Sequence, residues 1–536
     1  MKLLRKFPPI VIITIIAIMG SIMIYISTYW GPWVFSDSTG YIVAARNLIT
    51  GRGLGLYEPS GNFQPLSLHP PFYSLVLGFF GLFGADMVNT ARWMDIILFG
   101  LTILLVGITL YTFTRSRWLS ILGSFLLFCM PVLVDIFSGA MSEPLFIFIG
   151  LASILLILLF LRNNRFILLL TAGVTSGLAM ITRYSGLAFI FTGVFVLLVY
   201  SHKALKKRII NIIIYGILSC LPVIGWLTWL RIQSVGARSL QISSNVGQRF
   251  TQFRLAVLEV FWSWLPFTSL LPQYTYYLAR NLILIFIFLI LVLFCLTIWK
   301  MYKNNQKVFE STNGFLVALL LFAFTVAYLF ILAFSYIYTY PPPDIIPRTL
   351  LPMQIAVLLA VFSLILFFIR AWQSAKWLNI IPIVLLIGIS ISYLHDSIVI
   401  VSYNRQYGSG YTSKALRNSK LIFVVEQLPS KIPIISNESA LVLFYTGHPA
   451  YDISELMDAE LQDITNRFGD DLSDPAQKAF RENGAALVLF DSIFWQLEHL
   501  YGTQTSQRME YLTRGLSLYA QEEDGAVYFY PSAKLP

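Results

Sequence analysis

The sequence predicts an α-helical polytopic membrane protein with about eleven transmembrane helices, followed by a small C-terminal α/β domain. Of the 536 residues, 57% are hydrophobic and 12% are charged, a composition that excludes an ordinary soluble domain. Apolar runs long enough to cross a bilayer recur as far as residue 396. After them, strand-like and helix-like segments alternate, which is typical of an α/β domain.

The charge is distributed unevenly along the chain. Residues 1–400 contain 26 Lys and Arg against 10 Asp and Glu, whereas residues 401–536 contain 11 against 17. Basic residues in short loops beside membrane spans are topology signals, so the basic excess requires no nucleic-acid partner. Cys129, Cys220 and Cys295 all lie in apolar runs and show neither a disulfide framework nor a zinc spacing.

The first apolar run, residues 8–27, follows Lys2, Arg5 and Lys6. It is long for a signal-peptide core and no small-residue cleavage site follows it, so we interpret it as a retained span. The other predicted spans are 88–113, 118–137, 144–161, 166–182, 186–201, 209–230, 280–299, 314–335, 350–370 and 378–396. The segment 71–84 is short for a crossing and is predicted to be an interfacial or re-entrant helix.

The lysines support one orientation of these spans. With the N-terminus in the cytoplasm, every lysine before residue 400 falls in a segment that the predicted topology places inside: Lys2, Lys6, Lys203, Lys206, Lys207, Lys300, Lys303, Lys307 and Lys376. We therefore predict a cell-membrane protein with a transmembrane module at 1–396 and an extracytoplasmic domain at 397–536. The other long outer segments are the first outer loop, 28–87, and residues 231–279.

The C-terminal domain is predicted element by element. Helices are expected near 412–428, 454–466, 474–482 and 492–514. A further short helix is expected between Asn437, as its N-cap, and Gly447, at which it ends. Strands are expected at Ile432–Ser436, near 450–453, at Ala486–Phe490 and at Ala526–Tyr530. The domain shows no glycine-rich phosphate loop and no nucleophile elbow.

Asp37 is the first candidate functional residue, because a carboxylate where a span meets water costs free energy unless something uses or pairs with it. One interpretation is a helix N-cap, and the other is a catalytic or metal-binding acid. The helix that follows carries Tyr41 on one face and Arg46 on another, both candidate substrate-binding residues, and is expected to end at Gly51.

Two further candidates lie at the outer ends of predicted spans. Glu143, followed by Pro144, suits a helix N-terminus, and alternatively it is a partner base, hydrogen-bonding group or metal ligand facing Asp37. Arg348 could hold a lipid phosphate bidentately, or could pair with Asp344 four residues earlier.

The remaining candidates carry weaker signals. Arg183 and Tyr184 suit either phosphate binding or a topology and interface role, and His69 suits metal or phosphate binding or polar packing. Five aromatic residues suggest an interfacial belt or, alternatively, a platform for sugar stacking: Trp262, Trp264, Tyr274, Tyr276 and Tyr277.

Several short motifs, in this order and on this side of the membrane, resemble the GT-C glycosyltransferases. They are an acid followed by Tyr and Ala-Arg-Asn-Leu in the first outer loop, His-Pro-Pro-Phe-Tyr, Ser-Glu-Pro-Leu-Phe, Thr-Arg-Tyr-Ser-Gly and Arg-Thr-Leu-Leu-Pro. The nearest branch resembles the protein O-mannosyltransferases and lipid A aminoarabinose transferase-like proteins. The resemblance covers roughly residues 1–400, to which a variable outer domain is added.

The resemblance implies an inverting transferase that uses a polyprenyl-phosphate sugar on the extracytoplasmic face. Asp37 then corresponds to the catalytic acid, Glu143 to an acid of the second outer loop, and Arg348 to a basic residue near the donor phosphate. Ser38 stands where relatives carry Glu, which weakens the transfer of any metal dependence. No cofactor is firmly implied; a divalent metal, if used, has Asp37, Glu143 and His69 as its candidate ligands.

The implied partners are the membrane, a lipid-linked sugar donor, and a lipid, glycan or protein acceptor. The competing hypotheses are a transporter or flippase of lipid-linked or small polar substrates, and a GT-C protein that has lost its activity. A transporter is expected to show repeated halves and broken helices near the midplane, and no internal repeat is visible in the sequence.

Overall fold

The computed structural model describes residues 8–200, 204–233, 239–240, 245–266, 292, 296, 313–371, 380–453 and 475–530. Residue contacts divide the chain into two compact units. The first, here called the helical unit, comprises Met1–Tyr29, Ser67–Tyr73 and Thr90–Gln406. The second, here called the mixed unit, comprises Trp30–Leu66, Ser74–Asn89 and Tyr407–Pro536.

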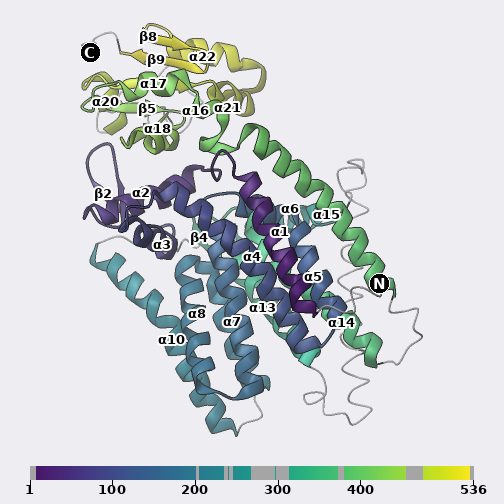
Figure 1. Cartoon of the computed structure of the whole chain (residues 1–536). Coiled ribbons are helices and arrows are strands. Elements are labelled where there is room, and N and C mark those ends of the chain that lie inside the picture. The colour runs from purple at the N-terminus through teal and green to yellow at the C-terminus, as the bar shows by residue number, and fades with distance from the viewer. Residues whose placement is uncertain are drawn as a thin grey trace. The chain divides into compact units, whose positions relative to one another are not determined.

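Long apolar helices dominate the chain (Figure 1). Among the described residues, seven helices are long and apolar enough to cross a membrane, or up to eight if a bent pair counts as one. The seven are α1 Pro9–Ser27, α4 Met87–Thr114, α7 Glu143–Asn163, α10 Leu205–Ile232, α13 Asn313–Tyr338, α14 Pro347–Ala371 and α15 Ile380–Tyr407. The predicted class, a helical membrane protein with a small C-terminal sheet, is therefore confirmed. The count of eleven stays a prediction, and the predicted span 280–299 lies outside the described residues apart from two single positions.

The predicted span 118–137 is wrong as one continuous helix. It consists of α5 Arg117–Cys129 and α6 Pro131–Phe137, which meet at an angle of 61°. Pro131 has no backbone N–H and disfavours a helical conformation at the residue before it, and Met130 is extended with φ −73° and ψ 111°. A single proline therefore breaks this span, and the short helix α6 leads on to the start of α7, where Glu143 lies.

Three apolar helices are shorter than a full span. These are α3 Phe72–Gly81, α8 Phe166–Thr182 and α9 Leu187–Tyr200, the last preceded by the 3-10 turn Tyr184–Gly186. The segment predicted to be a short helix at 71–84 thus forms the ten-residue helix α3. Whether α3 is interfacial or re-entrant stays a prediction.

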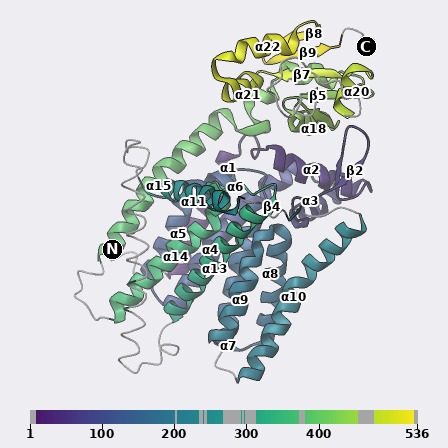
Figure 2. The same ribbon diagram turned by 180° about the vertical axis from the view of Figure 1, so that it is seen from behind.

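Helices α7, α8, α9 and α10 pack into one group, in which α8, α9 and α10 lie side by side (Figure 2). A buried chain of hydroxyls runs across it, from Ser153 through Ser176, at 2.5 Å, to the Tyr215 hydroxyl, at 2.7 Å. The Tyr215 hydroxyl also contacts the Phe189 carbonyl oxygen at 3.1 Å. Buried polar groups that satisfy one another fix the register of adjacent helices, and here they align the start of α7 with the end of α8.

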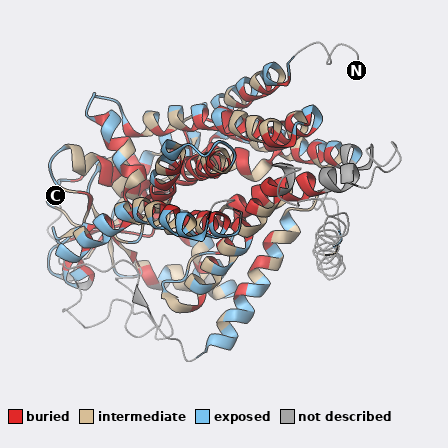
Figure 3. Cartoon of the chain, turned by 90° about the horizontal axis from the view of Figure 1, so that it is seen from below, coloured by how far each residue is buried: buried red, intermediate tan, exposed pale blue. Residues whose placement is uncertain are grey.

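The outward faces of the helices are apolar, and Figure 3 shows where the exposed residues lie. On α10, Ile213 is 52% exposed and Leu221 is 63% exposed. A soluble protein would bury such side chains, so their exposure fits contact with lipid.

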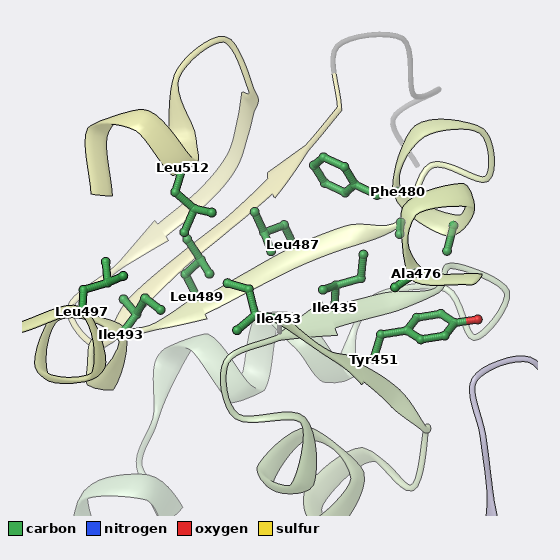
Figure 4. Packing of buried hydrophobic residues seen from close by; sticks show 12 residues of the cluster. Ile435, Tyr451, Ile453, Ala476, Phe480, Leu487, Leu489, Ile493, Leu497 and Leu512 are labelled. Atoms are coloured by element: carbon green, nitrogen blue, oxygen red, sulfur yellow. The ribbon is translucent and has the colours of Figure 1, made fainter. Parts of the chain in front are cut away.

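The mixed unit is built on a five-stranded sheet of order β6-β5-β7-β9-β8. Its strands are β5 Ile434–Ser436, β6 Ala450–Asp452, β7 Ala486–Phe490, β8 Ser517–Glu522 and β9 Gly525–Phe529. The pairs β6–β5 and β5–β7 are parallel, whereas β7–β9 and β9–β8 are antiparallel. Ile435, Leu487 and Leu489 project into a core that Phe480, Ile493 and Leu512 close from the helices (Figure 4).

The helices of this domain are shorter than predicted. The segment 412–428 contains a 3-10 turn, α16 Lys414–Arg417 and α17 Lys420–Glu426, because Ser419 caps a new helix through a bond from the Ile422 amide. The segment 492–514 divides at Gly502 into α21 Ser492–Tyr501 and α22 Thr505–Thr513, joined by the 3-10 turn Gly502–Gln504. Helix α20 is Pro475–Arg481, and the predicted helix 454–466 lies outside the described residues.

The N-cap position of helix α18, Ser439–Thr446, is Glu438, whose side chain makes no capping bond, and not Asn437 as predicted. The Asn437 amide instead bonds across to the end of β7: the Phe490 amide donates to Asn437 Oδ1 at 2.9 Å, and Asn437 Nδ2 donates to Ser492 Oγ at 2.9 Å. A tertiary contact has therefore taken the side chain that a local rule assigns to a cap.

Part of the first outer loop belongs to the mixed unit. It contains α2 Ser36–Ile49 and a hairpin of β1 Gly55–Tyr57 and β2 Phe63–Pro65. Helix α18 packs against α2. Gly51 has φ +76° just after α2 and Gly447 has φ +71° just after α18, so both helices end at the predicted glycines.

Two short strands, β3 Ser239–Leu240 and β4 Thr339–Tyr340, pair in the helical unit, and α11 Val246–Ser263 lies between them in the sequence. Of the five predicted belt aromatics, Trp262 and Trp264 lie at the end of α11. Tyr274, Tyr276 and Tyr277 lie outside the described residues.

Candidate active site

Glu143 begins α7 and is 1% exposed. Ser142 is the N-cap and Pro144 follows inside the first turn, where its missing N–H and fixed φ suit a helix start. The partial positive charge of the helix N-terminus favours an anion at this position. A buried carboxylate nevertheless needs a counter-charge, because desolvation otherwise makes its ionised form costly.

Arg183 supplies this counter-charge from the end of α8. Its Nη1 lies 2.7 Å from Glu143 Oε1 and donates to Ser142 Oγ at 3.2 Å. Ser142 Oγ lies 3.4 Å from Glu143 Oε2 and completes the contact. The Glu143 side chain is 2% exposed and that of Arg183 is 25% exposed, so the pair is buried on the acid's side and partly accessible on the guanidinium's side.

The backbone turn after α8 points Arg183 toward this acid. Arg183 is extended, with φ −147° and ψ 135°, and the turn Tyr184–Gly186 closes with the Gly186 amide donating to the Arg183 carbonyl at 2.8 Å. A Cβ on Gly186 would lie 2.6 Å from the Ala179 carbonyl carbon, so the turn requires glycine in order to fold back on α8.

Tyr184 attaches a second segment to this turn. Its hydroxyl donates to the Ser67 carbonyl at 3.3 Å and accepts from Trp226 Nε1 at 3.1 Å. Ser67 lies two residues before the half-buried His69, so the chain around His69 is fixed beside the Arg183 turn.

Arg348 lies in the first turn of α14 and is half-buried. The next residue, Thr349, accepts at its carbonyl from the Tyr328 hydroxyl at 2.7 Å, and its own hydroxyl donates to the Asp344 carbonyl at 2.8 Å. The fully buried Tyr328 is within electrostatic reach of both Arg183 and Glu143. Tyr328 therefore bonds the start of α14 and lies within electrostatic reach of the Glu143–Arg183 pair.

A small apolar pocket, with a cavity volume of about 10 Å³, lies one helical turn away from these polar groups. Ile147 follows Glu143 by four residues, Pro352 follows Arg348 by four, and Phe324 precedes Tyr328 by four. The lining consists of Ile147, Leu151, Ile154, Phe189, Leu321, Phe324, Pro352, Ile355 and Ala356. Residues four apart share a helix face, so α7, α13 and α14 each present a polar group beside an apolar wall.

The other three candidates lie on α2 in the mixed unit. Phe35 is the N-cap, and the half-buried Asp37 lies in the first turn, so Asp37 is not the cap residue itself. Tyr41 is 1% exposed, and its carbonyl accepts from Ser74 Oγ of α3 at 3.1 Å. Arg46 lies in the last turn and is half-buried.

The structure thus brings Glu143, Arg183 and Tyr184 together directly, and places the segments of His69 and Arg348 beside them. Asp37, Tyr41 and Arg46 share one helix of the other unit. The functional roles of all eight residues stay predictions.

Asp95 is a residue that the sequence interpretation missed. It lies within α4, is 0% exposed, and in the described part of the chain neither of its carboxylate oxygens has a hydrogen-bond partner. The charge of Glu143 acts on it. An acid inside an apolar span is itself a functional signal, and this rule could have identified Asp95 from the sequence. Ser142, Trp226 and Tyr328 carried no comparable signal.

Within the residues that the structure describes, no group of three His, Cys, Asp or Glu side chains is arranged to hold a metal ion. Glu143, one suggested ligand, is engaged by Arg183. A divalent metal with Asp37, Glu143 and His69 as candidate ligands stays a prediction.

Comparisons with known proteins agree with this architecture. Residues 67–240 match the model of the family described as dolichyl-phosphate-mannose-protein mannosyltransferase. A search of curated protein sequences found no match.

Two kinds of solved structure are similar along nearly the whole chain. ArnT from Cupriavidus metallidurans bound to undecaprenyl phosphate is 12% identical, with 97% of this chain and 99% of that chain covered and a TM-score of 0.55. The same protein in the apo state is 11% identical, with 96% and 97% covered and a TM-score of 0.55. The archaeal oligosaccharyltransferase AglB from Archaeoglobus fulgidus, in complex with an inhibitory peptide and a dolichol-phosphate, is 10% identical, with 99% and 75% covered and a TM-score of 0.50.

At these identities the structural likeness shows a shared fold. The family match covers residues 67–240 alone and agrees with that fold. The chain is an integral membrane protein in which residues 67–240 resemble the dolichyl-phosphate-mannose-protein mannosyltransferases.

Proposed function

We propose that this protein transfers a sugar from a polyprenyl-phosphate donor to an acceptor hydroxyl, with inversion at the anomeric carbon. The observation that carries the proposal is the position of the Glu143–Arg183 pair, one helical turn from an apolar pocket. A lipid-linked sugar has the same two parts, an anionic phosphate beside an apolar chain.

The cations assigned to the donor phosphate are Arg183 and Arg348. A guanidinium presents a planar fork of donors that matches two phosphate oxygens, and its charge persists at any physiological pH. Glu143 holds Arg183 in place while a quarter of the arginine side chain remains accessible. The apolar surface that Ile147 and Phe324 form at this small pocket is assigned to contact with the first part of the lipid chain.

The solved relatives support this class of donor. One was determined with undecaprenyl phosphate and another with a dolichol-phosphate. Both ligands combine a polyprenyl chain with a phosphate, which is the chemistry assigned here to Arg183, Arg348 and the apolar pocket.

The proposed reaction is a single displacement. The acceptor oxygen forms a bond to the anomeric carbon, the bond from that carbon to the phosphate oxygen breaks, and polyprenyl phosphate leaves with the electron pair. Asp37 takes the proton of the acceptor hydroxyl as general base. The arginines stabilise the charge that develops on the leaving phosphate.

The remaining assignments follow the predicted topology. We place the N-terminus in the cytoplasm and the reaction on the extracytoplasmic face, where lipid-linked donors present their sugars. The acceptor is a lipid, glycan or protein hydroxyl, and Tyr41, Arg46, His69 and Tyr184 are assigned to substrate binding.

The test is donor turnover by purified protein in lipid, measured as release of polyprenyl phosphate from a panel of polyprenyl-phosphate sugars with lipid, glycan and peptide acceptors. Asp37→Asn is expected to lower the rate by about 10²–10⁴-fold, because a general base contributes this much. Binding of polyprenyl phosphate is expected to be unchanged.

Asp86→Asn is the matched control. Asp86 is an exposed acid of the same unit whose Oδ1 accepts from the Asn89 amide at 2.9 Å, and asparagine caps a helix as well as aspartate does. If Asp37→Asn keeps more than about a tenth of the wild-type rate, Asp37 is not the general base.

A further inference from the structure

A loop of the C-terminal region lies directly on the chain that leads into α2. This loop, Gly408–Thr412, is here called the Tyr411 loop. The Tyr411 amide donates to the Val34 carbonyl at 2.8 Å, and Thr412 Oγ1 donates to the Pro32 carbonyl at 2.7 Å. Val34 is 0% exposed, so its carbonyl depends on this contact in place of water.

Glycine allows the two backbones to approach this closely. Gly410 has φ +60°, and a Cβ at this position would overlap the Val34 carbonyl oxygen and lie 3.0 Å from the Val34 nitrogen. Any side chain at residue 410 would therefore displace Val34 or the loop itself.

Aromatic rings extend the contact on both sides. The ring of Tyr411 lies 6.0 Å from that of Phe35 and 6.2 Å from that of Phe444, which belongs to α18. The Tyr411 carbonyl accepts from the Tyr445 hydroxyl at 2.7 Å. Burial, followed by the nearby Glu438, raises the pKa of Tyr411, so its hydroxyl stays neutral and can donate to that carboxylate.

These contacts converge on the first turn of α2. Phe35 is the N-cap, its carbonyl accepts from the Thr39 amide at 2.9 Å, and Asp37 lies between them in the sequence. The N-cap residue sets the direction in which the chain enters a helix. The backbone contacts at Pro32 and Val34 and the ring contact at Phe35 therefore fix how the chain enters the helical turn that carries Asp37.

We propose that the Tyr411 loop is the positioning element for Asp37, with Gly410 and Thr412 as positioning residues. This inference rests on the proposed role of Asp37 as general base. It gives the C-terminal region a direct part in turnover: it holds the base in reach of the acceptor hydroxyl, and a misplacement of about 1 Å costs on the order of 10²-fold in rate.

The principal test compares Gly410→Ala with Gly447→Ala. Both glycines have positive φ, +60° and +71°, so alanine introduces similar backbone strain at each. A Cβ at Gly447 meets nothing within 4 Å, whereas one at Gly410 meets Val34. Only Gly410→Ala is expected to lower kcat, by about 10–100-fold, with the donor KM unchanged.

A second pair avoids any strain. Thr412→Val removes the hydroxyl that reaches Pro32 and keeps the shape, whereas Thr412→Ser keeps the hydroxyl. We expect Thr412→Val to lower kcat, and we expect Thr412→Ser, which keeps the hydroxyl, to have the wild-type kcat. A readout independent of activity is hydrogen exchange at the Thr39 amide, which should accelerate in Gly410→Ala and Thr412→Val alone.

The inference is overturned if folded Gly410→Ala and Thr412→Val both match the wild-type kcat, or if Gly447→Ala loses as much as Gly410→Ala. If Gly410→Ala and Thr412→Val match the wild-type kcat while Asp37→Asn is inactive, Asp37 can still be the general base, and only the positioning role of the Tyr411 loop is refuted. If Asp37→Asn remains active, the general base itself is wrong and the inference fails with it.

Discussion

The ion pair between Glu143 and Arg183 offers the sharpest test of the candidate site. Arg183→Met keeps most of the apolar stem of the arginine and removes its charge, which leaves the buried Glu143 carboxylate without its counter-ion. Glu143→Gln keeps the shape of the acid and removes its charge. The double variant removes both charges together.

The distances set the expected magnitudes. At 2.7 Å, two unit charges attract by about 6 kcal/mol with an effective dielectric constant of about 20, before the cost of desolvation. Removing one partner of a buried pair costs about 3–5 kcal/mol of unfolding free energy. Arg183 is a quarter exposed, so we expect about 3 kcal/mol for Arg183→Met and about 1 kcal/mol for Glu143→Gln.

The assay is a double-mutant cycle on the unfolding free energy in detergent, followed by tryptophan fluorescence. Because the double variant leaves no uncompensated buried charge, it should lose about 2 kcal/mol less than the sum of the single variants. Arg183→Met should also weaken the binding of polyprenyl phosphate. Losses that simply add would show that the two side chains do not stabilise each other and would refute the electrostatic account of this site.

Two further predictions concern other parts of the chain. Arg348→Ala should weaken donor binding by about 10–100-fold, the value of a charge-assisted hydrogen bond, and leave the acceptor KM unchanged; a change in acceptor affinity alone would contradict the phosphate role. Asn437→Ala leaves the Phe490 amide without its acceptor and removes the amide that donates to Ser492, and should lower the unfolding free energy by about 1–3 kcal/mol. The exposed Asn418→Ala is the control, and equal thermal stability of the two variants would show that the Asn437 contacts contribute nothing.

The sequence predicted those features that short-range physics controls. The apolar runs at residues 8–27 and 88–113 became α1 and α4, because a run of about twenty apolar residues is itself the signal for a span. Strand β7 has the predicted bounds, Ala486–Phe490, because all five residues are buried and therefore apolar. Strand β8 was missed, since an edge strand with an exposed face carries no clear apolar alternation.

Elements also deviated where a single residue competed with the pattern. Pro131 divides an apolar run of full span length, and Gly502 divides a run that is otherwise compatible with one helix. In each case hydropathy predicted the element and backbone geometry decided where it breaks.

The sequence by itself determined the membrane class, most helix and strand positions, and the residue types able to bind a phosphate or accept a proton. Only the tertiary structure decided which of them meet. Glu143 finds Arg183 across two helices, and Thr412 reaches Pro32 over 380 residues. Hydropathy and capping act over a few neighbouring residues, whereas an ion pair or a backbone contact depends on which segments the fold brings within about 3 Å.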